Sequence, residues 1–151
     1  MSFHNGLVCV LKCDHGKTHG IVFMTNHKEG VVFQIYCKDL PEGLKGFHVH
    51  EKGNLVEFCK TLGPHYNPTD SVHGGLNTIP SHKGDLGNIY INQYGRCEME
   101  LIRYDLTLEE LLGRSLVIHG SKDDLGKGMN QESLQTGNSG KRICCGVIGY
   151  A

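Results

Sequence analysis

The chain has 151 residues, a formal net charge of −1 with histidine neutral, and 21% charged residues. This balance gives no reason to expect nucleic acid or a membrane surface as a partner, and no segment reaches the roughly 18 consecutive apolar residues of a membrane span. The length suits one domain over residues 1–151 with a sizeable core. The 21 glycines and the lack of tryptophan indicate many turns between short strands.

Eight short segments predict strands, because each is apolar or alternating and is bounded by Gly, Asn, Asp or Pro. Eight strands without a convincing amphipathic helix favour an all-β fold, an eight-stranded antiparallel barrel or sandwich. The segment 106–112 is ambiguous: its leucines suit a helical turn, but we interpret it as a loop that plugs the barrel end. The predicted strands are Leu7–Leu11, Gly20–Met24, Val31–Tyr36, Gly46–His50, Asn88–Asn92, Cys97–Tyr104, Ser115–His119 and Cys144–Tyr150.

Histidines are concentrated between the fourth and fifth predicted strands. On a strand, residues i and i+2 face the same side about 6.6 Å apart, so His48 and His50 can reach one ion. The loop that follows is long for a compact domain, and metal coordination would supply its order. His119 ends a distant apolar run and can close the site from a neighbouring strand. Five of the ten histidines lie here, followed by one aspartate: His48, His50, His65, His73, His82 and Asp85.

The ligand types indicate two different ions. Four imidazoles suit copper, whereas three imidazoles and a carboxylate suit tetrahedral zinc. The counts work only if one histidine serves both ions. A His-x-His pair alone is usually a surface pair, and Gly-Asp-Leu-Gly alone is an ordinary turn. Six histidines and an aspartate in these contexts favour the metal site instead.

The seven cysteines are expected to be mostly reduced, because their number is odd and the first five residues lack a basic-then-apolar signal region. We therefore expect the protein in the cytosol or nucleus, with a cytoplasmic location as our prediction. Four of the cysteines lie in apolar strands, where packing as small hydrophobic side chains is expected. These four are Cys9, Cys13, Cys37 and Cys97.

Several motifs together resemble the copper–zinc superoxide dismutases, in one register over nearly the whole chain. Only the segment from about 93 to 110 looks shorter and divergent. The resemblance implies an immunoglobulin-like Greek-key barrel or sandwich with two long functional loops, a metal and disulfide loop at about 51–87 and an electrostatic loop at about 120–143. The matching segments are Gly46–Glu51, Gly63–Pro68, His73–Gly75, Gly84–Gly87, Asp123–Gly128, Thr136–Arg142 and Cys145–Gly149.

The resemblance also implies a site with one copper and one zinc per chain and an enzyme that converts superoxide to dioxygen and hydrogen peroxide. In it, His65 bridges the two ions and carries a proton, and Arg142 docks the anion at the channel mouth. Asp123 links a copper ligand to a zinc ligand, and Cys59 pairs with Cys145. The implied copper ligands are His48, His50, His65 and His119; the implied zinc ligands are His65, His73, His82 and Asp85.

The electrostatic loop departs from the family pattern. Substrate guidance maps to Glu132, Thr136 and Arg142, but Gln131 stands where an acid is expected and Gln135 where a lysine is expected. The net charge is preserved, while the positive charge nearest the channel is lost. We expect an active enzyme with a weakened guidance field.

The resemblance further implies a homodimer and, for maturation, a possible copper chaperone. Lys141 and Ile143 are not prolines, and this favours some chaperone-independent loading. Lys52 and Tyr150 depart from the usual residue types of the dimer patch. That patch maps to Lys52, Gly53, Gly113, Arg114, Ile148 and Tyr150.

Two rival functions come from other classes of protein. A non-catalytic metal carrier often lacks a copper ligand or the arginine, and both are present here. A two-metal hydrolase usually uses bridging carboxylates, and only one carboxylate ligand is visible.

Overall fold

The computed structural model describes residues 6–13 and 16–151, so the signal-region prediction for residues 1–5 lies outside the described residues. In chain order the elements are β1 (Leu7–Cys13), β2 (Thr18–His27), β3 (Gly30–Cys37), β4 (Gly43–His50), the 3₁₀ helix η2 (Phe58–Thr61), β5 (Asp85–Ile91), β6 (Cys97–Tyr104), α1 (Leu108–Leu111), β7 (Ser115–His119), α2 (Gln131–Thr136) and β8 (Arg142–Tyr150). None of the described helices is long and apolar enough to cross a membrane.

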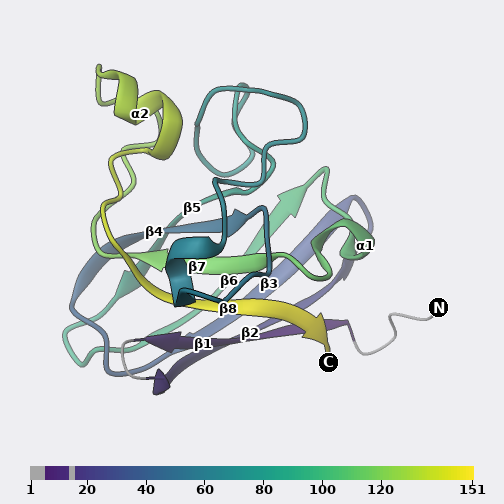
Figure 1. Ribbon diagram of the computed structural model, residues 1–151, viewed down its shortest axis with the longest axis vertical. Coiled ribbons are helices and arrows are strands. Elements are labelled where there is room, and N and C mark those ends of the chain that lie inside the picture. Colours follow the sequence, from purple (N-terminus) through teal and green to yellow (C-terminus); the bar gives the residue numbers. More distant parts are fainter. Residues whose placement is uncertain (1–5, 14–15) are drawn as a thin grey trace.

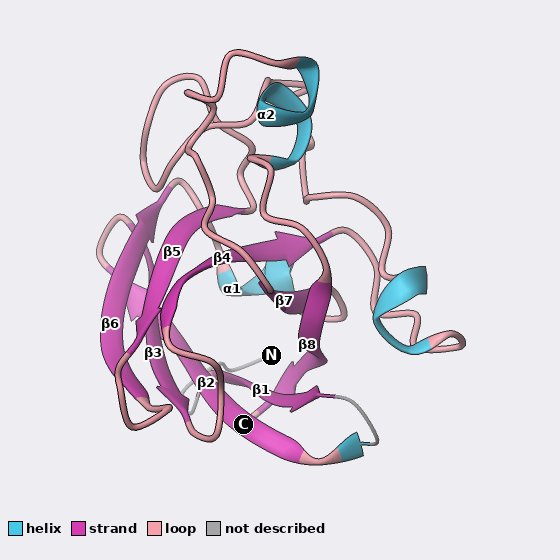
Figure 2. Ribbon diagram, turned by 90° about the vertical axis from the view of Figure 1, so that its left-hand side faces the viewer, coloured by secondary structure: helices cyan, strands magenta, loops and turns pink. Residues whose placement is uncertain are grey.

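The eight strands form one antiparallel sheet in the order β5-β4-β7-β8-β1-β2-β3-β6. The sheet curls until its two edge strands, β5 and β6, contact each other, and Figure 2 shows the nearly closed ring. Strands β4 and β7 are neighbours although β5 and β6 come between them in the chain, as in a Greek-key connection. The predicted all-β, eight-stranded antiparallel barrel is confirmed.

Alternation of side chains fills the barrel. In β1, for example, Leu7, Cys9 and Leu11 are buried, while Val10 points outward and is exposed. The largest fully buried side chains are Phe33 and Phe47. Aliphatic residues from every strand surround them, so the interior is one contiguous hydrophobic core.

Strands β4 and β7 differ from the rest because both of their faces are buried. All five residues of β7 are buried, and so is every residue of β4 from Lys45 onward. One face packs on the core, and the two long loops, 51–84 and 120–141, cover the other. Figure 1 shows these loops, with α2, together beyond β4 and β5. This covered outer face is where the predicted ligands gather.

The interpretation of 106–112 as a loop is wrong, because this segment contains α1. Thr107 caps the helix: its hydroxyl accepts the Glu110 N–H, and the Glu110 carboxylate accepts the Thr107 N–H. This reciprocal capping box stabilises a helix start. Leu106, Leu108 and Leu111 are buried in the core, and α1 is seen across the barrel opening in Figure 2. The segment therefore does close the barrel, as a helix.

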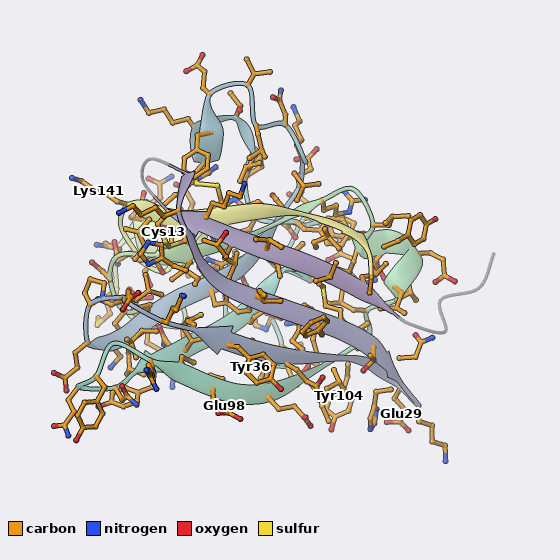
Figure 3. All side chains as sticks on the ribbon, turned by 90° about the horizontal axis from the view of Figure 1, so that it is seen from below. Cys13, Glu29, Tyr36, Glu98, Tyr104 and Lys141 are labelled. Atoms are coloured by element: carbon orange, nitrogen blue, oxygen red, sulfur yellow. A yellow bond between two sulfur atoms is a disulfide. The ribbon has the colours of Figure 1, made fainter. Side chains whose placement is uncertain are left out.

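The structure contains two disulfides, Cys13–Cys144 and Cys59–Cys145. The expectation that Cys13 is reduced is wrong, because the β1–β8 register places it directly opposite Cys144. Figure 3 shows Cys13 on β1, alongside β8. The other strand cysteines, Cys9, Cys37 and Cys97, are buried free thiols as expected.

Candidate metal centre

The outer face of β4 presents His48 and His50, and the end of β7 presents His119. Pairing of β4 with β7 sets Val117 opposite His48, so His119 lies two residues further along the neighbouring strand. All three imidazoles are buried beneath the long loops. The sheet therefore brings His48 and His50 together with His119 from the neighbouring strand, as the i, i+2 spacing predicted.

The long loop 51–84 returns to β4 and brings its own histidines. The Tyr66 N–H donates to the Val49 carbonyl at 2.8 Å, and a bridge pairs His65 with His50. Further along, the Gly84 N–H donates to the Tyr66 carbonyl at 2.9 Å. These main-chain bonds make a short extra ladder along the edge of β4. The ladder fixes His65 directly over the strand histidines.

Asp85 organises the second half of the site. Its Oδ2 accepts the His82 N–H at 2.8 Å and the Gly74 N–H at 2.9 Å. Its Oδ1 lies 2.8 Å from His73 Nδ1 and 3.2 Å from His65 Nδ1. One carboxylate oxygen therefore holds the loop backbone, and the other faces the imidazoles.

Two groups of ligand atoms lie within 4.8 Å of one another and can hold a metal ion. The second group contains His48, where the sequence led us to expect His82. His82 is nevertheless close, with its Nδ1 3.0 Å from His65 Nδ1 and 3.4 Å from Asp85 Oδ1. The structure thus brings all seven predicted ligands together. The groups are His48, His50, His65 and His119, and His48, His65, His73 and Asp85.

Hydrogen bonds to outer ring nitrogens aim the inner nitrogens at common points. His50 Nδ1 lies 2.9 Å from the Gly63 carbonyl, and His119 Nδ1 lies 3.1 Å from the Gly140 carbonyl. Because a carbonyl only accepts, each Nδ1 carries the proton and each Nε2 carries a lone pair. The two Nε2 atoms face each other at 3.3 Å. Two facing lone pairs fit a cation between them.

Four buried atoms of the site lack a hydrogen-bond partner among the described residues. They include both sides of the close His73–Asp85 contact, so that pair is not itself a hydrogen bond. Buried polar atoms are normally paired, and an absent ion explains such exceptions. The ligand atoms present therefore fit metal ions at both groups. The unpaired atoms are His48 Nδ1, His65 Nε2, His73 Nδ1 and Asp85 Oδ1.

His65 is the residue whose two ring nitrogens both face other ligands. Its Nε2 lies in the group with the strand histidines, where its ring stacks on His48 at 3.9 Å between centroids. Its Nδ1 faces His82 and Asp85. Among the described residues no backbone carbonyl anchors this ring, unlike the rings of His50 and His119. Its geometry is that of a shared ligand.

Asp123 joins the two groups through the outer ring nitrogens of two histidines. Its Oδ2 lies 2.6 Å from His48 Nε2 and its Oδ1 lies 2.7 Å from His73 Nε2, so one carboxylate orients both rings. Sequence reasoning missed the residue that holds this aspartate. The Asn88 side chain accepts the Asp123 N–H at 2.7 Å and donates to the Asp123 carbonyl at 2.9 Å. Nothing in the sequence around Asn88 signals this role.

Gly137 is a second missed residue. It ends α2 in the left-handed conformation (φ 76°), and a Cβ at this position would collide with Asp123 and His73. A helix that ends in Gly is a signal readable from the sequence, but the contact with the aspartate is not.

Burial controls the protonation of the strand histidines. It lowers the pKa of His48 and His50 well below the ordinary value, and it lowers the pKa of His119 to about 4. These imidazoles are therefore neutral at pH 7, as metal ligands must be. At His73 burial acts in the same direction, but the hydrogen bond to Asp123 and the negative charges of Asp85 and Asp123 outweigh it and raise the pKa to about 9. A metal ion that binds His73 therefore has to displace a proton from this imidazole.

The site opens to solvent through a pocket of about 1110 Å³. Arg142 stands in its wall, half-buried, and donates to the Cys59 carbonyl at 2.9 Å and to the Gly63 carbonyl at 2.8 Å. The Cys59–Cys145 disulfide fixes the same loop to β8, so the guanidinium has a firm support. Thr136 and Glu132 also line this pocket, and the Thr136 hydroxyl donates to the Glu132 carboxylate at 2.7 Å.

The copper/zinc superoxide dismutase (SODC) family matches residues 18–148. The chain is 44% identical to the Cu-Zn superoxide dismutase of Cryptococcus neoformans var. grubii and 40% identical to that of Cordyceps militaris; each match covers 95% of this chain and 97% of the relative. It is 43% identical to the extracellular Cu-Zn superoxide dismutase of Onchocerca volvulus, over 95% of this chain and 75% of the relative.

Proposed function

Because this chain belongs to the copper/zinc superoxide dismutase family, we propose that its two groups of ligands hold different metals. Superoxide dismutation, an oxidoreductase reaction, is the function of the family. We assign copper to His48, His50, His65 and His119, and zinc to His65, His73, His82 and Asp85. His82 replaces His48 in the second set because the inner nitrogen of His48 serves the first group.

The observation that carries this proposal is the position of His65 between the two groups. Copper supplies one-electron redox chemistry when bound, and zinc, with a filled d shell, supplies none. Two superoxide anions and two protons give dioxygen and hydrogen peroxide. One proton is held and delivered by the chain: we assign it to His65 Nε2, which lies toward the strand histidines, while Nδ1 stays fixed toward Asp85.

Arg142 receives the anion in this proposal. Its guanidinium remains charged and presents a planar fork beside the strand histidines, where a small anion fits. Its two bonds to backbone carbonyls hold it in place without neutralising it. Asp123 keeps His48 and His73 oriented, so we assign it a positioning role.

The test is superoxide decay by pulse radiolysis, using protein shown to hold one copper and one zinc per chain. We expect a rate constant near about 10⁸–10⁹ M⁻¹s⁻¹, the diffusional range for which superoxide dismutase is itself a standard example. His65→Ala should lose most of this rate, whereas His19→Ala, outside the ligand groups, should retain it. Absence of decay with both metals bound would replace this proposal with a non-catalytic metal carrier.

We also propose a single domain over the whole chain, a cytoplasmic location, a homodimer and copper loading that does not strictly need a chaperone. Three free thiols among the described residues support a reducing compartment, although some relatives are named as extracellular.

Expression in cells without the copper chaperone tests whether copper loading needs that chaperone. Copper-free, inactive protein there would remove the proposal of chaperone-independent loading.

The proposed dimer patch needs one correction. Ile148 is buried in the barrel core, so it cannot contact a partner. Lys52, Gly53 and Gly113 are exposed on the same patch, and Gly53 packs against the Gly113 carbonyl. The exposed apolar residue Val56 follows shortly after in the chain. These residues support a smaller interface, with the Lys52 ammonium reaching its rim.

A further inference from the structure

Two of the free cysteines lie directly opposite each other, away from the metal centre. The β3–β6 register pairs Cys37 with Cys97. Their neighbours Tyr36 and Glu98 are exposed and point outward from the two strands in Figure 3. Because side chains alternate along a strand, both cysteines point into the barrel. Both belong to its core cluster, at the barrel end where β3 finishes and β6 begins.

The neighbouring thiol is the largest cause of the raised pKa of Cys37 and of the lowered pKa of Cys97. The Tyr90 N–H, on β5, also favours the Cys97 thiolate. The pair is therefore asymmetric: Cys97 loses its proton more readily than Cys37. A thiolate is the reactive form of cysteine.

The pair can be reached from solvent. Cys37 lines an open groove of about 570 Å³, together with His19, Lys38 and Arg96. Cys37 and Cys97 retain 7% and 5% exposure. Cys9, by contrast, has none, and burial raises its pKa to about 12. Cys9 therefore serves as an internal reference for an inert thiol.

The register also allows the two sulfurs to bond. Directly opposed residues of an antiparallel pair have Cα atoms about 4.5–5.5 Å apart, within the range of about 4.4–6.8 Å that disulfides span. The chain contains a second inward pair with the same direct opposition, Cys13 and Cys144, and that pair is bonded. No rearrangement of the sheet is required for Cys37 to bond to Cys97.

We propose that Cys37 and Cys97 form a dithiol that hydrogen peroxide oxidises to a disulfide, with Cys97 attacking and Cys37 resolving. The Cys97 thiolate attacks one peroxide oxygen, the O–O bond breaks, and hydroxide leaves and is protonated to water; Cys97 becomes a sulfenic acid. The Cys37 sulfur then displaces the sulfenic hydroxyl as a second water. Two thiols and one peroxide give one disulfide and two waters. The proposal rests on the proposed function only for the source of the oxidant, since dismutation releases peroxide.

The test adds hydrogen peroxide to the copper- and zinc-loaded protein and maps its thiols by differential alkylation and peptide mass spectrometry. We expect a linked Cys37–Cys97 peptide, two hydrogens lighter than the separate thiols, while Cys9 stays reduced. In Cys37→Ser the reaction should stop at a Cys97 sulfenic acid, which dimedone traps. In Cys97→Ser no trapped adduct should form, and Cys37 should be consumed at least roughly tenfold more slowly.

Three results would overturn the proposal: no linkage at peroxide concentrations that oxidise free cysteine, oxidation of Cys9 at the same rate, or a trapped adduct on Cys37 in place of Cys97. Alanine variants at both positions provide a second pair if a serine hydroxyl disturbs the barrel. Because peroxide is added, the result does not depend on dismutase activity. An inactive protein that still forms the linkage would disprove the proposed function and leave this inference standing.

Discussion

At the scale of single residues, Gly137 is where backbone geometry and the metal centre meet. We expect Gly137→Ala to displace Asp123 from His73 and to weaken zinc binding by about 10- to 100-fold, the usual effect of losing such a supporting carboxylate. Competition with a zinc chelator measures this. Gly140→Ala is the matched control, because Gly140 has nearly the same φ (74°) but a Cβ there would approach only Ser121. Equal losses in both variants would attribute the effect to backbone strain alone.

Gln135 lines the pocket that leads to Arg142, whereas Gln131 lies outside it. We expect Gln135→Lys to raise the dismutation rate constant roughly severalfold at low ionic strength, because a cation at the mouth attracts superoxide. The gain should fall as salt is added and screens the field. Gln131→Lys adds the same charge to the same loop and should gain less. Equal gains would mean that only net charge matters.

Glu110 links the barrel to the metal loop. Its carboxylate accepts from Tyr66 at 2.7 Å and Lys83 at 3.0 Å. Burial alone would raise its pKa, but these bonds and the Thr107 N–H outweigh burial and lower it below 4.5. A carboxylate with a lowered folded pKa contributes stability above its unfolded value, and that contribution is lost as pH falls through the folded value.

We therefore expect Glu110→Gln to be less stable than the parent at pH 7, and the difference to shrink as pH falls below about 4.5. Urea unfolding between pH 3 and 7 measures this. Glu109→Gln, at the exposed neighbouring position, should show little pH-dependent difference. A Glu110→Gln deficit that stayed constant with pH would mean that lost packing, not charge, causes it.

At the scale of elements, the sequence predicted some boundaries better than others. Both ends of β6 and β7 were predicted correctly, because a Gly or an Asp lies within two residues outside each end of these strands. Strand β4 begins at Gly43, three residues earlier than expected, because the residues from Gly43 to Lys45 also pair with β5. Helix α1 was missed although Thr107 and Glu110 have capping-box spacing. One turn of helix lies below the length at which periodicity is informative.

The two long loops depend on the metal ions more than the barrel does. Their fixed points include the ligands and Asp123, while the strands have their own ladders and core. We expect removal of both ions by a chelator to accelerate hydrogen exchange in 51–84 and 120–141. Amides of β1, β2 and β3 should keep their protection and serve as the control. Unchanged protection in both loops would show that the disulfide and hydrogen bonds suffice.

At the scale of the whole molecule, the clustering of the candidate ligand side chains could be predicted from the sequence, but the pairing of distant segments could not. The histidine cluster is visible because histidine is a rare residue type and most of these histidines lie in or beside one long loop. The Cys13–Cys144 pair and the support of Asp123 by Asn88 depend on which strands are neighbours, and composition does not contain that information. On β8, Cys144 faces the barrel core and Cys145 faces η2, so adjacent cysteines bond on opposite faces of one strand.

The proposed homodimer is also a property of the whole molecule. We expect sedimentation of the metal-loaded protein to give a species of twice the 16.7 kDa chain mass at micromolar concentration. Val56→Glu should shift it toward single chains, because Val56 is an exposed apolar residue of the proposed interface. Lys12→Glu, on β1 outside this patch, is the charge control. If the parent protein sediments as a single chain, the proposed homodimer is wrong.

Asp123 has one further consequence. Because its two oxygens hold a histidine from each group, an ion that fixes one ring also fixes the carboxylate for the other ring. In the proposed site the two metals would therefore be each other's effectors. By thermodynamic reciprocity, the factor by which zinc tightens copper binding must equal the factor by which copper tightens zinc binding, whichever ion arrives first.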